Sequence, residues 1–289
     1  MKTADFIIIG AQKSGTTALF KFLYKNPEIY LPPQKEVQFF SVPEYFKKGI
    51  DWYSKEFYSG ISNDIVCGDI SPQYMFYDSV PKRIKETLPE VKLIAILRNP
   101  VDRAYSHYNM SVRRGQEKRN FIDAFNYSVE QNNQGQESII ESESYYQFSN
   151  YKESLAKYCE YFSKDNILIL FQEDLTSSPI NTLNKIYQFI NISEVFYPDN
   201  PKEKVHQSGV KKHPKIEQWL LNENVIKTLI KPLIPTKWRA AFRFWIEQIN
   251  VNPTNNNPLT DKENKFLHWL VIEQNNFLKN EFNLDSPWL

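Results

Sequence analysis

The stretch FIIIGAQKSGTT, from Phe6 to Thr17, decides the fold. Its first four residues are bulky and apolar and stop at Gly10, which is typical of a buried strand that ends in a tight turn. From Thr16 onward the apolar residues recur at helical spacing, at Leu19, Phe20, Phe22 and Leu23. The sequence therefore predicts a strand, a glycine-containing turn and a helix in immediate succession.

The same succession returns further along the chain. Apolar strands are predicted at 65–67, 91–97 and 167–171, with helices starting from about Val101 and about Pro179. Continuous apolar strands that alternate with helices predict an α/β fold, a parallel β-sheet flanked by helices on both faces. Ligands of such sheets bind beyond the carboxyl ends of the strands, so the residues after Ile9 and Leu97 are the first candidates for a site.

Composition limits the classes of function. A chain of 289 residues with 41% hydrophobic content is long enough for a full core, and we predict a single domain over residues 1–289. Because 35 Lys and Arg residues face 34 Asp and Glu residues, the protein has no global basic field and is not expected to bind nucleic acid. Neither the cysteines Cys67 and Cys159 nor the four histidines show metal-ligand spacing, so we predict no metal site.

Location and mobile segments are predicted from composition as well. The N-terminal residues lack a signal-like apolar region and no run reaches membrane-spanning length, so a cytoplasmic protein is expected. Residues 131–144 are polar and predict a mobile loop, and residues 191–256 predict an acceptor-site or lid segment. Within the latter, residues 225–251 mix aromatic and basic side chains. They fit a peripheral membrane contact, but a buried helix with solvated basic edges or a wall of the acceptor site is the commoner case.

The turn from Gly10 to Thr17 has the glycine spacing of a P-loop, G-x-x-x-x-G-K-[ST], at the required strand-to-helix position. At the start of a helix, backbone N–H groups and the helix dipole favour phosphate. The groups expected to point at it belong to Ser14, Gly15, Thr16 and Thr17. The usual lysine position holds Thr16, however, and the loop's only lysine is Lys13. A lysine this far forward does not serve a β/γ-phosphate in the usual way.

This loop resembles the 5′-phosphosulfate loop of sulfotransferases that use 3′-phosphoadenosine 5′-phosphosulfate (PAPS), in particular the heparan sulfate N- and 3-O-sulfotransferase branch. The resemblance implies a P-loop-like sulfotransferase fold, PAPS as donor, 3′-phosphoadenosine 5′-phosphate as product and no metal. It also implies that Lys13 is catalytic, contacting the oxygen between phosphate and sulfate and stabilising the leaving phosphate. The alternative is a degenerate nucleotide loop of another P-loop protein.

A second motif runs from Arg98 to Ser106 and follows the strongest predicted strand, with Pro100 suited to the first turn of a helix. It resembles the family's 3′-phosphate motif, an Arg-[DN]-Pro opening followed by a serine. By that resemblance Arg98 and Ser106 bind the 3′-phosphate of PAPS, through a charge-assisted fork and a hydroxyl. Taken singly, Arg98 paired with an acidic neighbour and Ser106 on a helix surface would be the commoner reading.

A third segment, Ser208 to Pro214, resembles the late PAPS-binding loop of the same branch. The positions carried over are Ser208, Gly209, Lys211 and Lys212. Glycine comes one position early, and Lys211 stands where the family has arginine, which keeps the charge but loses the planar fork. A solvated basic loop is the alternative.

On the acceptor side, Lys35 to Phe40 resembles the family's Glu-Val-His-Phe-Phe segment, which makes Glu36 the general base. Gln38 replaces the family's histidine. In the stretch Gly68 to Tyr74, Asp69 replaces a glutamate and Ile70 a lysine that lies near the acceptor in the family. The resemblance therefore covers the donor better than the acceptor.

Together these motifs predict a PAPS-dependent sulfotransferase of the EC 2.8.2 type, which acts on a hydroxyl or amine of a carbohydrate or small-molecule acceptor. One alternative is a Mg²⁺-dependent P-loop kinase or NTPase, which has no need of an arginine for a 3′-phosphate. Another is a non-catalytic nucleotide-binding or membrane-surface module, which only residues 225–251 support.

Overall fold

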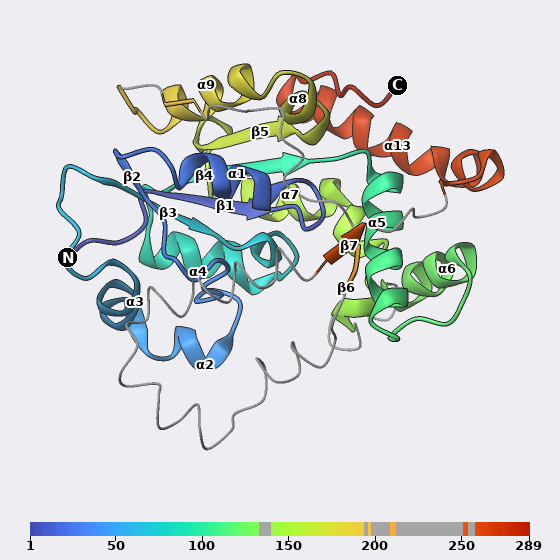
Figure 1. The fold of residues 1–289 in the computed structure, drawn as a ribbon, viewed down its shortest axis with the longest axis horizontal. Helices are drawn as coiled ribbons and strands as arrows, with labels where there is room; N and C mark the ends of the chain where they lie inside the picture. The colour runs from blue at the N-terminus through green and yellow to red at the C-terminus, as the bar shows by residue number, and fades with distance from the viewer. Residues whose placement is uncertain (133–139, 194–195, 198–208, 212–250, 254–257) are drawn as a thin grey trace. The chain divides into compact units, whose positions relative to one another are not determined.

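The computed structural model describes residues 1–132, 140–193, 196–197, 209–211, 251–253 and 258–289. The chain forms two compact units, one of residues Met1–Glu203 with Leu259–Leu289 and one of residues Lys204–Pro258. The first unit holds the large sheet and the helices around it (Figure 1). The single domain expected from the sequence stays a prediction.

The sheet of the first unit has five strands in the order β2-β3-β1-β4-β5. Their bounds are β1 Phe6–Gly10, β2 Ile29–Tyr30, β3 Val66–Ile70, β4 Lys92–Leu97 and β5 Ile167–Phe171. Every neighbouring pair is parallel, and the central strand β1 is buried along its whole length. The predicted parallel sheet is thus confirmed, with the carboxyl ends of β1, β3 and β4 side by side.

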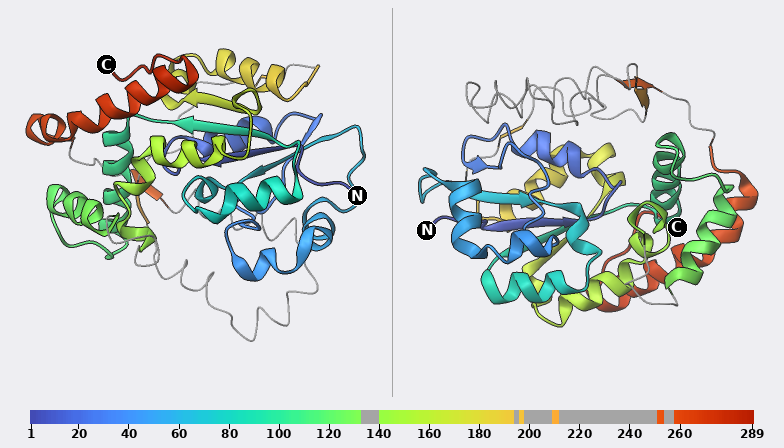
Figure 2. Two further views of the ribbon diagram at one scale, coloured as in Figure 1. Left: turned by 180° about the vertical axis from the view of Figure 1, so that it is seen from behind. Right: turned by 90° about the horizontal axis from the view of Figure 1, so that it is seen from below.

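Helices cover both faces of this sheet. The α-helices are α1 Thr16–Leu23, α2 Pro43–Phe46, α3 Gly49–Tyr58, α4 Ser79–Thr87, α5 Pro100–Arg113, α6 Phe121–Asn132, α7 Tyr151–Cys159, α8 Gln172–Ser177, α9 Pro179–Phe189 and α13 Asp261–Phe282. Short 3₁₀ turns are η1 Pro72–Met75, η3 Glu141–Glu143, η4 Gln147–Ser149 and η5 Lys164–Asn166. In Figure 2, α1 and α9 lie on one face and α4 and α7 on the other.

Two predicted elements differ from the structure. The helix expected from about Pro179 is preceded by the short helix α8, which follows β5 directly. In the stretch 131–144, predicted as a mobile loop, the first two residues end α6 and residues Glu141–Glu143 form η3, while residues 133–139 lie outside the described part of the chain. Local polar composition predicted a loop there, but contacts with the rest of the chain order its end.

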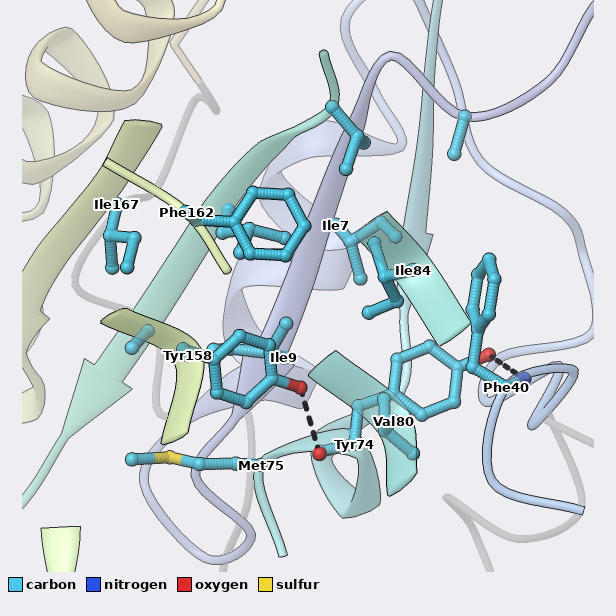
Figure 3. Packing of buried hydrophobic residues seen from close by; sticks show 14 of the residues in the cluster. Ile7, Ile9, Phe40, Tyr74, Met75, Val80, Ile84, Tyr158, Phe162 and Ile167 are labelled. Carbon is cyan, nitrogen blue, oxygen red and sulfur yellow. Dashed lines mark hydrogen bonds between the residues drawn. The ribbon is translucent and has the colours of Figure 1, made fainter. Parts of the chain in front are cut away.

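The alternation of side chains along β1 builds the core. Ile7 and Ile9 lie in one cluster with Ile84 of α4 and Tyr158 of α7, all fully or almost fully buried (Figure 3). Side chains alternate across a strand, so Phe6 and Ile8 face the opposite side. A central strand buried on both faces fixes the position of the loop that follows it.

The second unit contains a two-stranded antiparallel sheet of β6 Gly209–Lys211 and β7 Val251–Pro253. Gly209 and Lys211, carried over from the family's late loop, therefore lie on β6. Ser208, Lys212 and residues 225–250 lie outside the described residues, and so does most of the segment 191–256. Their proposed roles, and the predicted cytoplasmic location, stay predictions.

In the part of the chain that the structure describes, no helix combines the length and apolar character that crossing a membrane requires.

Candidate active site

The loop after β1 is fixed by close contacts. A Cβ atom at Gly10 would lie 2.7 Å from the Cβ of Met75, so a larger residue does not fit there. The N–H of Ala11 donates to the carbonyl of Ile96 at 2.7 Å, which joins the loop to β4. Gly15 has a φ of 97°, in the left-handed region that favours glycine, and leads directly into α1.

The N–H groups of this loop are divided between two tasks. The N–H of Ser14 donates to the carbonyl of Ala11 at 3.2 Å and so closes the loop itself. Those of Gly15, Thr16 and Thr17 donate to no backbone carbonyl among the described residues. The fully buried Ser14 hydroxyl also lacks a hydrogen-bond partner in this described part. Three amides and one hydroxyl are thus available for an anion at the start of α1.

Lys13 extends from this loop into a strongly positive environment. Its Nζ lies 3.9 Å from the Sδ of Met110 on α5. Burial, and to a lesser degree the positive charges of four arginines, together lower the pKa of Lys13 from 10.5 to about 8. These are Arg113, Arg114, Arg98 and Arg103. Among the described residues no carboxylate forms an ion pair with Lys13. A bound anion would stabilise the charge of this lysine and of the arginines around it.

Arg98 stands where β4 ends and lies beside the loop. Its Nη1 is 3.5 Å from the carbonyl oxygen of Lys13. The Tyr151 hydroxyl donates to the Arg98 carbonyl at 2.8 Å, and Asn99 caps α5 by accepting from two amides of its first turn. The structure therefore brings together Lys13 and Arg98, two residues that the sequence predicts to bind PAPS. Ser106 lies on α5 one turn before Met110, a spacing that places the two on one helix face.

Sequence reasoning missed Arg103, whose side chain is fully buried. It donates from Nε to the Ser149 hydroxyl at 2.7 Å, from Nη2 to the Tyr145 carbonyl at 2.9 Å and from Nη1 to the Gln12 carbonyl at 3.5 Å. Burial lowers its pKa to about 10. Within the described chain no carboxylate pairs with it, so its charge adds to the field at Lys13. Its place one turn into the helix after Arg98 was the only signal.

Glu36 is held at both carboxylate oxygens. Lys35 Nζ lies 3.0 Å from Oε1, and Gln73 Nε2 donates to Oε2 at 2.9 Å. The Glu36 N–H donates to the carbonyl of Ile70 at the end of β3, at 3.1 Å. Its side chain is 33% exposed. Glu36 thus has one orientation and remains open to an acceptor, as a general base requires.

A buried carboxylate is linked to the segment that carries Glu36 through two hydroxyl groups. Asp69 accepts hydrogen bonds from the hydroxyls of Ser71 at 2.7 Å and Tyr74 at 3.0 Å. These hydroxyls in turn accept the amide N–H groups of Gln38 and Phe40, each at 3.4 Å. Burial raises the pKa of Asp69 to about 6. Asp69, which replaces the family's glutamate, therefore positions the backbone that carries Glu36.

A second glutamate lies near Glu36. Gln12 of the loop donates from Nε2 to Oε1 of Glu141 at 3.3 Å. Burial raises the pKa of Glu141, and the charge of Glu36 adds to that rise. Glu141 was missed because it falls in the stretch predicted as a mobile loop. Glu141 also interacts electrostatically with Arg114, so it lies between Glu36 and the arginine cluster in its interactions.

Within the described ranges, no group of three or more His, Cys, Asp and Glu side chains is arranged to hold a metal ion.

The chain was compared with known proteins. A family model described as "Sulfotransferase domain" matches residues 3–233. The membrane-associated sulfotransferase kil1 of Dictyostelium discoideum is 36% identical over 48% of this chain and 29% of its own length. The bifunctional heparan sulfate N-deacetylase/N-sulfotransferase 2 of Homo sapiens is 32% identical over 66% of this chain and 23% of its own. The heparan sulfate glucosamine 3-O-sulfotransferase 5 of Mus musculus is 30% identical over 64% of this chain and 53% of its own length. The match spans about half of these relatives' length or less.

Solved structures show the same fold. A sulfotransferase from Alicyclobacillus acidocaldarius superposes with a TM-score of 0.61 at 25% identity, over 86% of this chain and 96% of its own. The mouse sulfotransferase SULT7A1, solved with PAP, superposes with a TM-score of 0.50 at 16% identity, over 96% and 85%. At that identity the second structure supports the fold alone. Since the family model matches most of the residues and the fold agrees, the chain belongs to the sulfotransferase family.

Proposed function

We propose that this chain transfers a sulfuryl group from PAPS to a hydroxyl or amine of an acceptor, with a carbohydrate or glycoconjugate as the acceptor class. The observation that carries the proposal is the environment of Lys13. A buried lysine among four arginines, with no described carboxylate paired to it, suits a donor that carries several negative charges. Membership of the sulfotransferase family supports the same donor.

The residues fit the donor at both of its anionic ends. The free amides of Gly15, Thr16 and Thr17, the Ser14 hydroxyl and Lys13 would hold the 5′-phosphosulfate. Arg98, and Ser106 further along α5, would hold the 3′-phosphate. A kinase reading is not favoured, because Thr16 occupies the position of the lysine that serves the β/γ-phosphates.

The same residues suggest how the transfer proceeds. The donor supplies the sulfuryl group, whose bond to the phosphate oxygen breaks as a bond to the acceptor oxygen or nitrogen forms. Lys13 donates a hydrogen bond to the phosphate oxygen that leaves, and Glu36 accepts the proton that the acceptor loses. Glu36 is held by Lys35 and Gln73 before the reaction starts, which lowers the cost of bringing the base into line with the acceptor.

The acceptor class rests on the relatives and on the site's departures from them. Two of the named relatives are heparan sulfate sulfotransferases, which supports a carbohydrate. Gln38 and Ile70 stand where that branch has histidine and lysine, and Ile70 brings no positive charge to the end of β3. The acceptor of this chain is therefore expected to differ from heparan sulfate in its charge.

Calorimetric binding of 3′-phosphoadenosine 5′-phosphate, AMP, ADP and Mg²⁺-ATP tests the donor. The wild type is expected to prefer the 3′-phosphorylated nucleotide by at least tenfold, because Arg98 recognises that phosphate. Arg98→Ala should lose the preference, while Arg83→Ala, on α4, should keep it. Equal or tighter binding of Mg²⁺-ATP by the wild type would overturn the proposal and favour a P-loop phosphotransferase.

A further inference from the structure

Lys35 joins the donor loop to the base. Its ammonium donates to the hydroxyl of Thr17 at 2.7 Å and to Oε1 of Glu36 at 3.0 Å. The side chain is 18% exposed, so it is partly buried but not closed off. Among the hydrogen bonds of the described residues, Lys35 alone joins Glu36 to the loop after β1 and the start of α1.

We propose that Lys35 is a further catalytic residue, which contacts the sulfuryl group during transfer; this inference rests on the proposed function. Thr17 belongs to the first turn of α1, where the amides that face the 5′-phosphosulfate lie. Glu36 faces the acceptor, on the other side of the group that moves. An ammonium that touches both is therefore placed along the path of that group.

The two lysines of the site have separate surroundings. Lys13 extends toward α5, where it contacts Met110 and lies among the arginines, on the side of the leaving phosphate. Lys35 makes neither of these contacts and instead pairs with the base. Two of the three N–H bonds of its ammonium are used by Thr17 and Glu36, which leaves one for a sulfuryl oxygen.

Such a contact would act on the charge that the transfer moves. Oxygens of the sulfuryl group keep negative charge while the bond to phosphate breaks and the bond to the acceptor forms. A fixed ammonium beside them stabilises that charge without reorganisation. Because Glu36 holds the ammonium in place, neither its position nor its charge has to be gained during the reaction.

The sulfuryl group is what distinguishes PAPS from the product 3′-phosphoadenosine 5′-phosphate, and this gives a direct test. Lys35→Met is expected to bind the product as the wild type does, but to lose about tenfold in affinity for PAPS without acceptor. Its turnover should fall by about 100-fold or more. Lys82→Met is the matched control, since Lys82 also pairs with a glutamate, Glu86, on the exposed surface of α4.

Two further variants separate charge from position. Lys35→Arg keeps the charge and should recover part of the turnover. Lys35→Gln keeps an uncharged N–H donor on a side chain that is one bond shorter, and it should remain as slow as Lys35→Met. The inference would be overturned if Lys35→Gln recovered turnover, or if Lys35→Met lost as much affinity for the product as for PAPS. Either result would show that Lys35 only positions its neighbours.

Failure of the proposed function has a different signature. The wild type is measured first, and if it binds neither PAPS nor the product, the proposed function fails and the role of Lys35 fails with it. If the wild type binds and turns over while Lys35→Met does so equally well, only the role of Lys35 is overturned. Thermal unfolding of each variant confirms that the compared proteins are folded.

Discussion

At the scale of single residues, the position of Lys13 disfavours the positive charge of its ammonium group. Burial and four neighbouring arginines lower its pKa from 10.5 to about 8. A lysine whose pKa is lowered stays charged below that pH and becomes neutral above it. An anion bound beside it favours the charged form, so binding of the donor and protonation of Lys13 are coupled.

This coupling predicts a pH dependence of donor binding. The affinity for 3′-phosphoadenosine 5′-phosphate should be nearly constant from pH 6.5 to about 8 and fall above that, by up to about tenfold per pH unit. Calorimetry across this range measures it, and near pH 8 buffers of different ionisation enthalpy should report proton uptake. Lys13→Arg stays charged and should lack the decline. The same decline in both proteins would assign the effect to another group.

Some of these residues were predictable from sequence and others were not. Lys13, Glu36 and Arg98 follow strands or match a local motif, and the structure places Arg98 beside Lys13. Arg103 and Gln73 act through contacts that join distant parts of the chain, at sequence separations of 46 and 37 residues. Local spacing carries no signal for such contacts.

At the scale of elements, the end of β3 and the turn η1 form a support for the segment that carries Glu36. Asp69 is the penultimate residue of β3, and the hydroxyl of Tyr74 in η1 connects its carboxylate to the amide of Phe40. Figure 3 shows this last bond and a second one, in which the Tyr158 hydroxyl of α7 donates to the Tyr74 carbonyl at 2.8 Å. The orientation of Glu36 thus depends on three elements packed in the core.

Removal of one hydroxyl from this support should affect turnover without affecting the donor. Tyr74→Phe is expected to cost about 1 to 2 kcal/mol of unfolding free energy and to lower turnover by about tenfold. Affinity for 3′-phosphoadenosine 5′-phosphate should not change. Urea unfolding, steady-state kinetics and calorimetry measure the three quantities.

The matched control is Tyr145→Phe. Tyr145 is also fully buried, and its hydroxyl donates to a carboxylate, that of Glu117, at 3.1 Å. It should lose similar stability but keep its turnover. If both variants turn over like the wild type, the hydroxyl of Tyr74 does not position Glu36.

The predicted elements were those with long apolar runs. The strands β1, β4 and β5 and the helices α1 and α5 agree with the sequence pattern to within a few residues. The edge strand β2 has two residues, too few for any periodicity, and it forms because β3 offers a free edge. The 3₁₀ turn η3 lies in polar sequence and is ordered by tertiary contacts such as the one between Gln12 and Glu141.

At the scale of the whole molecule, the charge balance conceals a concentrated field. The formal net charge is +1, which predicts no global basic field. The structure shows a local field instead, because the loop after β1, the end of β4 and the helix α5 with the residue after it bring Lys13 and the four arginines together. Repulsion between like charges that folding brings together opposes folding. The cluster therefore lowers the free energy of unfolding of the protein without ligand.

Lys13→Gln should therefore stabilise the protein without ligand. Because the pKa of Lys13 is lower in the folded state, its charge costs stability below about pH 8, and the cost disappears as the pH rises from about 8 toward 10.5. The variant should exceed the wild type by about 1 to 3 kcal/mol at pH 7 and by much less at pH 10. Urea unfolding at both pH values measures the difference, with Lys82→Gln on the exposed surface of α4 as the control.

Saturating 3′-phosphoadenosine 5′-phosphate should reverse the order of stability at pH 7. At 100 times its Kd it stabilises the wild type by about 2.7 kcal/mol, and it stabilises the variant by less. A variant that is less stable than the wild type at pH 7 without ligand would mean that Lys13 contributes to folding through contacts that outweigh the repulsion.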